Sequence, residues 1–435
     1  MMRRALALLL LAVAPSVVVA QALPDTGTIR FEVAGVRIIH RQTNNNLVVA
    51  NLYLLGGTQL VSARTAGIEP MLLEVTGRGT QRYPGDQLRR AMARTGSEIG
   101  VGAQNDWTIF GMRTTTDRLD STWSIYTDRL LRPTLTAADV EFVRENRVAI
   151  LDQRSDSPDA LLSYLADSVA FAGHPYGLSP VGTSRSIRGI SRDDLLAFHR
   201  EQMVTSRMLL VIVGNIPRAK LQAMVASTLG TLPRGDYTWT APPAGAARPG
   251  SAVHIEPRRL PTNYVLGWFE GPPAGHPDVP ALRVASAILS GRLFAEIRSR
   301  RNLTYAVEAR FRDEALTSGG LYVTTTRPDT TLGLMRAEIR ALQQFVIPTE
   351  NLRPLIQQFL TEYFVDNETS GAQADFLARA ELYRGDFRAA ERFVSDLRAV
   401  TGEDVQRVAR TYMRNVRFAY IGNPQQVNRF RLMGF

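Results

Sequence analysis

Histidine is the side chain that most often binds a catalytic metal, and this chain has five of them. They are His40, His174, His199, His254 and His276, and no two lie within one helical turn of each other. A helix that binds zinc through two imidazoles needs that spacing, because only residues three or four apart project from the same face. The sequence therefore has no local zinc-binding pair, although a site assembled from distant histidines stays open.

The sequence also limits catalysis by cysteine and by serine. The chain contains no cysteine, which excludes thiolate catalysis, cysteine-bound metals, disulfides and lipid attachment to a cysteine. It also contains no Gly-x-Ser-x-Gly sequence, the local signature of a serine hydrolase. A self-sufficient hydrolase that uses a serine or aspartate arrangement remains one possible function of this chain.

The first 22 residues differ in composition from the rest of the chain. A cationic start, residues 1–4, precedes an unbroken apolar run, residues 5–14, and small residues allow cleavage after Ala20 or Ala22. This pattern predicts a signal peptide and export, which in a bacterium means the periplasm; a retained membrane anchor is the alternative. No later stretch is apolar and long enough to span a bilayer.

The formal net charge is +10, and nearly all of the basic residues are arginine, with Lys220 the only lysine. These cations are scattered along the chain. Nucleic-acid binding needs clustered cations, so we expect no nucleic-acid partner.

A segment rich in proline, glycine and alanine, 233–250, divides the chain into two halves. Each half ends with the same succession of elements. A helix with a hydroxyl cap begins at Ser191 and again at Thr401, and a β-type run then leads into a Gly-Asn turn at Gly214 and again at Gly422. This recurrence in register predicts an internal duplication, with one domain on each side of the linker.

Strand-like runs alternate with amphipathic helical segments in both predicted domains, 27–232 and 251–435. Residues 47–55 and 264–269 have strand patterns, whereas a capped helix begins after Thr136. Helices and strands mixed in one unit predict an α+β fold, in which helices pack against one face of a sheet.

The segment 67–80 resembles the zinc helix of the pitrilysin, insulinase and mitochondrial processing peptidase family. In that family a glycine precedes an inverted His-x-x-Glu-His motif, and a Gly-Thr pair follows it. The resemblance places the first metal histidine at Pro70, the catalytic glutamate at Leu73 and the second histidine at Glu74. All three residue types are replaced, and the family's third ligand, a later glutamate, aligns with Gln153.

The resemblance implies that this chain binds no zinc and is not a peptidase by itself. Without imidazoles a zinc ion cannot be held, and without a carboxylate at Leu73 no base activates a water molecule. Glu74 alone cannot hold the metal, and its alternative interpretation is a charge near the end of a helix.

Further matches extend the resemblance over about residues 27–425. The run His174-Pro175-Tyr176 resembles a family loop, and the two Gly-Asn turns match the strand that ends each repeat. The resemblance implies two homologous α/β-sandwich domains of the mitochondrial processing peptidase type, each with a mixed, mostly antiparallel sheet.

Arg298 and Tyr305 resemble the family's C-terminal substrate motif, a helix arginine followed by a tyrosine that enters a strand. In active relatives this pair faces the zinc site and binds the peptide near the scissile bond. A guanidinium and a phenol can both donate hydrogen bonds where charge develops on a carbonyl oxygen. The alternative is a surface arginine paired with Glu296 or its neighbours, and an ordinary strand tyrosine.

These features together imply the non-catalytic subunit of a heterodimeric zinc peptidase. Zinc would be the cofactor of a homologous partner chain with an intact His-x-x-Glu-His motif, and this chain would have no cofactor. Unfolded peptides would be the substrates, and Arg298 and Tyr305 would complete the partner's site. The alternative function is an envelope protein that binds peptides or acts as a scaffold without a part in catalysis.

Overall fold

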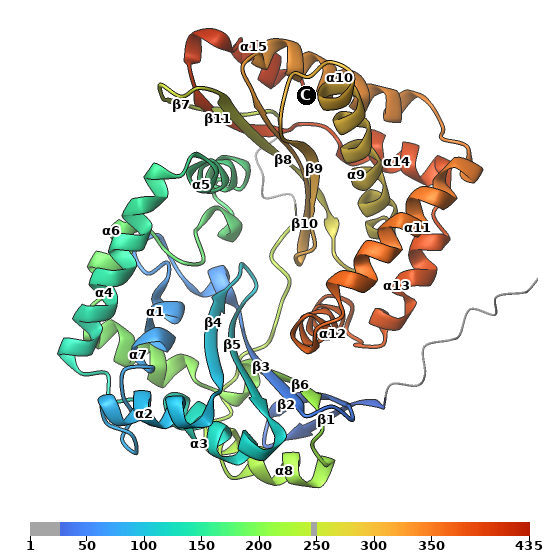
Figure 1. The fold of residues 1–435 in the computed structure, drawn as a ribbon. Coiled ribbons are helices and arrows are strands. Elements are labelled where there is room, and N and C mark those ends of the chain that lie inside the picture. Colours follow the sequence, from blue (N-terminus) through green and yellow to red (C-terminus); the bar gives the residue numbers. More distant parts are fainter. Residues whose placement is uncertain (1–26, 245–249) are drawn as a thin grey trace, which may run out of the picture.

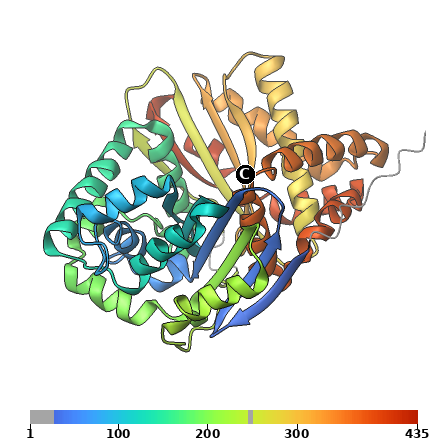
Figure 2. The same cartoon turned by 60° about the horizontal axis from the view of Figure 1, so that its bottom comes forward.

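The structure is a computed structural model that describes residues 27–244 and 250–435. The predicted signal peptide and residues 245–249 of the predicted linker lie outside these ranges, and residues 233–244 form no helix or strand. The two halves of the chain form two units that lie side by side (Figures 1 and 2).

The N-terminal half is built on a six-stranded sheet with the order β1-β2-β6-β3-β5-β4. Only β2 and β6 are parallel neighbours, and the other pairs are antiparallel. The strands are β1 (Thr28–Val33), β2 (Val36–Gln42), β3 (Leu47–Leu55), β4 (Glu98–Ala103), β5 (Trp107–Thr115) and β6 (Met208–Gly214).

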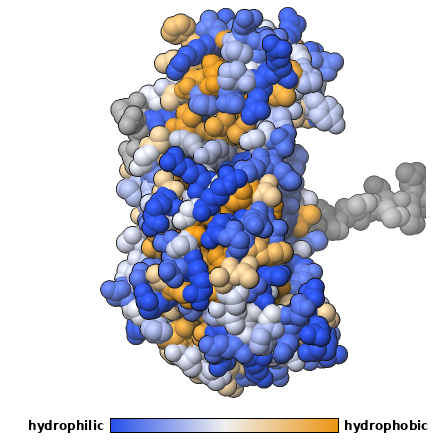
Figure 3. Space-filling view, turned by 90° about the vertical axis from the view of Figure 1, so that its left-hand side faces the viewer, coloured by the Kyte–Doolittle hydropathy of each residue, from blue (hydrophilic) through white to orange (hydrophobic). Residues whose placement is uncertain are grey.

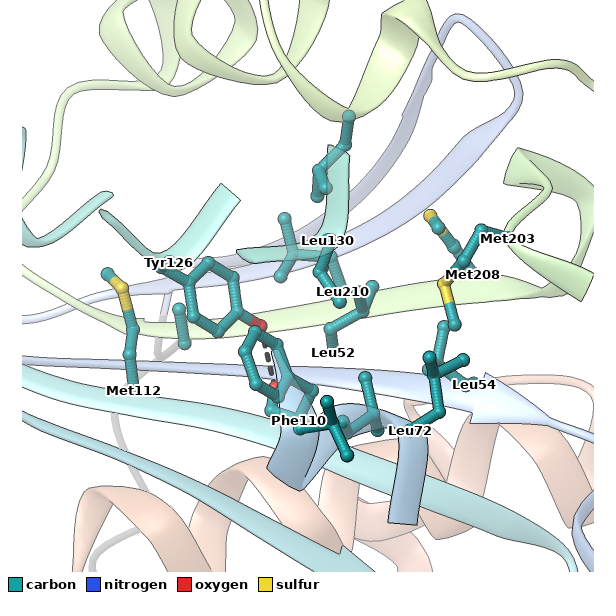
Figure 4. Close-up of a cluster of buried hydrophobic side chains, with 14 of the residues drawn as sticks. Leu52, Leu54, Leu72, Phe110, Met112, Tyr126, Leu130, Met203, Met208 and Leu210 are labelled. Atoms are coloured by element: carbon teal, nitrogen blue, oxygen red, sulfur yellow. Dashed lines mark hydrogen bonds between the residues drawn. The ribbon is translucent and has the colours of Figure 1, made fainter. Parts of the chain in front are cut away.

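Helices of the same half cover one face of this sheet. Figure 4 shows part of the resulting core, in which apolar side chains of strands and helices meet and the Tyr126 hydroxyl donates to the Phe110 carbonyl at 2.6 Å. Burial of each such large apolar side chain stabilises the fold by about 1.5–3 kcal/mol. The helices are α1 (Ile68–Val75), α2 (Asp86–Thr95), α3 (Leu119–Leu131), α4 (Ala137–Asp152), α6 (Ser184–Gly189), α7 (Arg192–Gln202) and α8 (Arg218–Ala226).

The C-terminal half repeats this arrangement with five strands in the order β7-β11-β8-β10-β9. The strands are β7 (Val253–Pro257), β8 (Asn263–Pro273), β9 (Val307–Arg312), β10 (Leu316–Thr325) and β11 (Arg417–Gly422). Its helices are α9 (Val279–Leu293), α10 (Pro328–Gln344), α11 (Thr349–Asp366), α13 (Ala389–Arg398), α14 (Gly402–Tyr412) and α15 (Arg429–Met433).

The two sheets correspond strand for strand, apart from the additional β1. In each, the strand that follows a capped helix pairs in parallel with an early strand of the same half. The two predicted hydroxyl caps are confirmed: Ser191 accepts from the main-chain N–H of Asp194, and Thr401 accepts from that of Asp404. The α+β fold and the mostly antiparallel sheets are confirmed as well.

The second face of each sheet is covered by a helix from the other half, which the sequence did not predict. α5 (Pro158–Ala170) belongs to the N-terminal half and packs on the C-terminal sheet, where Leu162 and Ala166 meet Trp268. α12 (Ser370–Arg384) belongs to the C-terminal half and packs on the N-terminal sheet, where Leu377 meets Val211 (Figure 1). β6 is therefore buried along its whole length, as expected for a strand covered on both faces.

The outer surface beside α4 carries apolar side chains in separate patches among charged ones (Figure 3). Phe142 and Ile150 of α4 are 47% and 67% exposed. Within the described residues, no helix combines the length and the apolar character that crossing a membrane requires.

Candidate functional site

α1 carries the three positions that align with the zinc motif. The helix begins after Gly67, whose φ of 85° is a left-handed conformation that glycine adopts readily. Pro70 lies in the first turn, where a missing N–H group is tolerated. Leu73 is fully buried in the core, so this position does not face solvent. Of the three, only Glu74 reaches the surface, with 42% of its side chain exposed.

Arg147 of α4 forms an ion pair with Glu74 of α1. Its Nη1 lies 2.5 Å from Oε1 of Glu74, and its Nη2 donates to the carbonyl of Val181 at 2.9 Å. Only 9% of the arginine side chain is exposed. The pair therefore ties α1 to α4 and to the segment that precedes α6.

Gln153, which aligns with the family's third zinc ligand, lies directly after the end of α4. α4 ends at Asp152, and Gln153 begins a short 3-10 turn in which its side chain is exposed. No hydrogen bond or ion pair joins Gln153 to α1 among the described residues. The residue of α4 that contacts α1 at this position is Arg147.

A second buried arginine, Arg129 of α3, binds the C-terminal end of α1. Its Nη2 donates to the carbonyl of Leu73 at 2.9 Å, and its Nε donates to Oγ1 of Thr76 at 3.2 Å. Burial lowers the pKa of Arg129 to about 10, so the guanidinium remains charged at neutral pH. A cation at this end satisfies carbonyl groups that the helix leaves unpaired and favours the helix dipole.

These residues do not fit a zinc ion. Zinc sites are built from imidazoles, thiolates and carboxylates, whereas two guanidinium groups contact α1 here and one of them already neutralises Glu74. Across residues 27–244 and 250–435, no three histidine, aspartate or glutamate side chains are grouped so that they could hold a metal. The position of the zinc helix is a packed and ion-paired junction of helices.

Arg298 and Tyr305 lie in contact with each other. Arg298 belongs to a π-helical segment, Phe294–Ser299, that extends α9. The carbon of its guanidinium lies 4.7 Å from the ring centre of Tyr305 and 4.9 Å from that of Phe294. Tyr305 is 82% exposed and Phe294 is 44% exposed. The three side chains form an exposed cluster, which we call the 294/298/305 cluster.

Neither the ion pair nor the strand position that the alternative interpretation expected is found among the described residues. Glu296 forms ion pairs with Arg300 and Arg301, and no carboxylate in the described part of the chain pairs with Arg298. Tyr305 precedes β9 and does not belong to the strand. The guanidinium is held over two rings by cation–π contacts, which leave its N–H groups available to a carbonyl or carboxylate acceptor.

Tyr305 is presented by a tightly bonded turn. Oγ1 of the buried Thr304 donates to the carbonyl of Ala306 at 2.8 Å and accepts from the N–H of Ala306 at 3.0 Å. Asn302 adopts a φ of 49° and donates its N–H to the carbonyl of Arg298 at 3.0 Å. These bonds hold the arginine and the tyrosine at a defined separation.

The edge strand β4 offers a main chain to which an extended peptide can pair. β4 is the last strand of its sheet and pairs only with β5. A Cβ atom added at Gly100 would have no atom within 4 Å, so the face of the strand is also open at this residue. Unpaired strand edges bind peptides by strand addition, and the sequence analysis did not identify this one.

The run His174-Pro175-Tyr176 has a structural role between the two halves. The buried hydroxyl of Tyr176 donates to Oδ1 of Asp106 at 2.6 Å, and the hydroxyl of Tyr383 on α12 donates to Oδ2 at 2.6 Å. The N–H of Ala315 donates to the same carboxylate at 2.9 Å. This matched loop consequently joins the two halves through the carboxylate of Asp106.

Sequence reasoning missed Arg147, Arg129 and Phe294. A signal for Arg147 was present, because it shares the apolar face of α4 with Val140 and Val143. A lone charge on such a face requires a buried partner. Nothing local indicates that Arg129 binds α1, and Phe294 gains its role only through the π-helical segment.

Comparison with known proteins gives consistent matches. The sequence profile described as the Peptidase M16 inactive domain matches residues 189–359. An uncharacterized zinc protease of Mycobacterium bovis is 26% identical over 365 residues, which cover 81% of this chain and 83% of that protein. Subunit 1 of the bovine mitochondrial cytochrome b-c1 complex is 24% identical over 272 residues, covering 62% of this chain and 56% of the subunit.

Solved structures show the same fold. A peptidase M16 inactive domain from Pseudomonas fluorescens superposes with a TM-score of 0.82 at 17% identity and covers 91% of this chain and 98% of that one. The periplasmic protease PqqL from Escherichia coli superposes with a TM-score of 0.74 at 16% identity. That match covers 97% of this chain and 49% of PqqL.

Proposed function

Because this chain is an inactive-type member of the pitrilysin/insulinase family of zinc peptidases, we propose that it is the non-catalytic, substrate-binding subunit of a heterodimeric zinc peptidase. The zinc ion and the catalytic base belong to a homologous partner chain. This chain supplies Arg298 and Tyr305, which bind the peptide beside the scissile bond. Their N–H and O–H donors stabilise the charge that develops on the carbonyl oxygen during hydrolysis.

The observation that carries this proposal is the environment of the Arg298 side chain. The arginines around α1 are buried and bonded to protein acceptors, as structural arginines are expected to be. Arg298 instead lies between two exposed rings with no carboxylate partner in the described residues. A cation positioned in this way is suited to an acceptor from outside the chain.

An unfolded peptide is the substrate form that this surface suits. Strand addition at β4 requires an extended main chain, and it recognises main-chain groups with little dependence on sequence. A partner chain that encloses the peptide would bring its own zinc helix to the other side of the bond.

Export to the periplasm belongs to the same proposal. It is supported by the signal-like residues 1–22 and by the structural similarity to a periplasmic protease. The assembly with a second chain is supported by the similarity to a subunit of the cytochrome b-c1 complex.

Reconstitution with a zinc-bearing homologue tests the shared site. The chain alone should cleave nothing, and the mixture should cleave an unfolded peptide. Arg298→Ala should lower the rate by about a hundredfold, as for the loss of an oxyanion donor, and Tyr305→Phe by about tenfold. Arg300→Ala is the matched control, since Arg300 is an exposed neighbour paired with Glu296. If Arg298→Ala and Tyr305→Phe both leave the rate unchanged, the shared site is wrong.

The second candidate is a peptide-binding or scaffold protein of the envelope. The similarity to subunit 1 of the cytochrome b-c1 complex favours it. It predicts stable binding of peptides or of a partner chain with no cleavage in any combination, and the same reconstitution distinguishes the two.

A further inference from the structure

A cavity of about 370 Å³ lies between α9, α11, α12 and α13 of the C-terminal half. It shares no lining residue with α1 or with the 294/298/305 cluster. Its volume is within the range of pockets that bind small ligands. Binding of a ligand in this cavity is therefore independent of the shared active site.

Aromatic rings form one wall of the cavity. Tyr363 lies against Phe393 with ring centres 4.4 Å apart and against Phe376 at 5.1 Å. Phe376 and Phe393 meet edge to face at 5.4 Å. Such ring faces attract cations and accommodate the alkyl chain that carries them.

Acidic groups predominate among the charged lining residues. Two arginines also line the cavity, but both are engaged: Arg283 pairs with Asp313 at 2.6 Å, and Arg379 pairs with Asp375 at 2.8 Å. Two further carboxylates, those of Glu362 and Asp366, line the cavity and do not belong to these two ion pairs. The lining is therefore net negative in a chain whose net charge is +10.

The carboxylates of this cavity have unused acceptor capacity. Oδ1 of Asp375 is enclosed and has no hydrogen-bond partner among the described residues. Within the described part of the chain, Glu362 accepts a hydrogen bond only from the side-chain amide of Gln358, at 3.1 Å. Asp366 has no ion pair in the same residues. Because the Asp375 oxygen is enclosed, a ligand in the cavity does not reach it, and the exposed carboxylates of Glu362 and Asp366 are the acceptors open to a cation.

We propose that this cavity binds a single alkyl-guanidinium or alkyl-ammonium group, such as the side chain of an arginine or lysine in a peptide. The alkyl chain lies along Tyr363 and Phe376, and the charged end reaches the carboxylates. An anion is disfavoured by the same charges, and a neutral apolar group would leave Glu362 and Asp366 without a cationic partner.

The test uses the full chain and a fluorescent peptide of alanine and glycine with one central arginine. The matched peptide carries citrulline, which keeps the shape and loses the charge. Agmatine serves as a competitor, to separate recognition of the side chain from recognition of a peptide main chain. Glu362→Gln with Asp366→Asn removes two lining charges, and Glu350→Gln with Glu368→Gln removes two exposed charges outside the cavity.

We expect the arginine peptide to bind and agmatine to displace it. The cavity variant should weaken binding by about fivefold or more, as for the loss of two partly exposed ion pairs, and the control variant should not change it. Equal binding of the citrulline peptide would overturn the proposal, as would equal losses in the two variants or the absence of binding. Circular dichroism of both variants shows that the fold is retained.

Discussion

Arginine side chains from three other segments hold α1 in place. Arg207 pairs with the buried Glu69 at 2.9 Å, Arg129 binds a main-chain carbonyl at the C-terminal end, and Arg147 pairs with Glu74. Breaking a fully buried pair costs about 3–5 kcal/mol, whereas a pair with one half-exposed partner contributes about 0–1 kcal/mol. The charges that stabilise α1 also make it unsuitable for a metal ion.

This arrangement predicts that restoring the zinc ligands of α1 is not enough to restore zinc binding. In a variant with Pro70→His and Glu74→His, Arg147 loses its carboxylate and faces the two imidazoles as an uncompensated cation. We expect no stoichiometric zinc after dialysis. Adding Arg147→Glu removes this charge and supplies a carboxylate ligand, so the triple variant should bind one zinc ion per chain.

Metal analysis of both proteins measures the outcome, and thermal unfolding controls for the fold. One tightly bound zinc in the double variant would show that Arg147 does not determine the loss of the metal.

At the level of elements, the exchange of α5 and α12 makes each sheet depend on the other half of the chain. Leu377 of α12 is 1% exposed against the N-terminal sheet, and Leu162 of α5 is fully buried against the C-terminal sheet. Without these helices, apolar residues of each sheet would face water. The two domains are consequently expected to unfold together.

Leu377→Ala tests this dependence. Deleting a buried leucine side chain costs about 2–5 kcal/mol, and the loss should destabilise both halves in one transition. Leu355→Ala on α11 is the matched control, because Leu355 is 44% exposed and its loss should change stability by less than about 1 kcal/mol. Denaturant unfolding followed by tryptophan fluorescence and circular dichroism measures both effects. Two separate transitions, or equal effects of the two substitutions, would contradict the expected coupling.

At the level of the whole molecule, the tips of two hairpins meet where the halves join. Asn105, between β4 and β5, donates to Oε1 of Glu314 at 3.0 Å, between β9 and β10. The pKa of Glu314 is raised to about 7, chiefly by burial and also by the nearby Asp106 and Asp167, against the opposing effects of Arg312 and Asn105. Burial also raises the pKa of Asp106.

Stability should therefore decrease as the pH rises from about 4.5 to 7. In this range the folded chain keeps a proton on Glu314 that the unfolded chain has released, so unfolding becomes more favourable as the pH rises. The loss should be on the order of 1–3 kcal/mol and should level off above pH 7. Melting temperatures between pH 5 and 8.5 measure it, and Glu314→Gln should flatten the decline. An identical pH profile in both proteins would show that Glu314 does not titrate in this range.

Some properties of this protein are determined by residue types and short spacings. The loss of zinc ligands at Pro70 and Glu74 is visible without a structure, because no other arrangement of the chain changes which side chains are present. The caps at Ser191 and Thr401 were also predictable, since a helix cap involves residues only three positions apart.

Only the tertiary structure decided what replaced the metal site. Arg147 and Glu74 are 73 residues apart, and the apolar pattern of α4 shows that Arg147 is buried but not which carboxylate it meets. The pattern of α12 shows an apolar face without indicating the sheet that it covers, because one apolar face can pack on any other. The sequence by itself thus determined that α1 contains no histidine. The structure decided that Arg147 pairs with Glu74 and that Arg298 lies beside Tyr305 with no carboxylate partner among the described residues, since both depend on packing between distant segments.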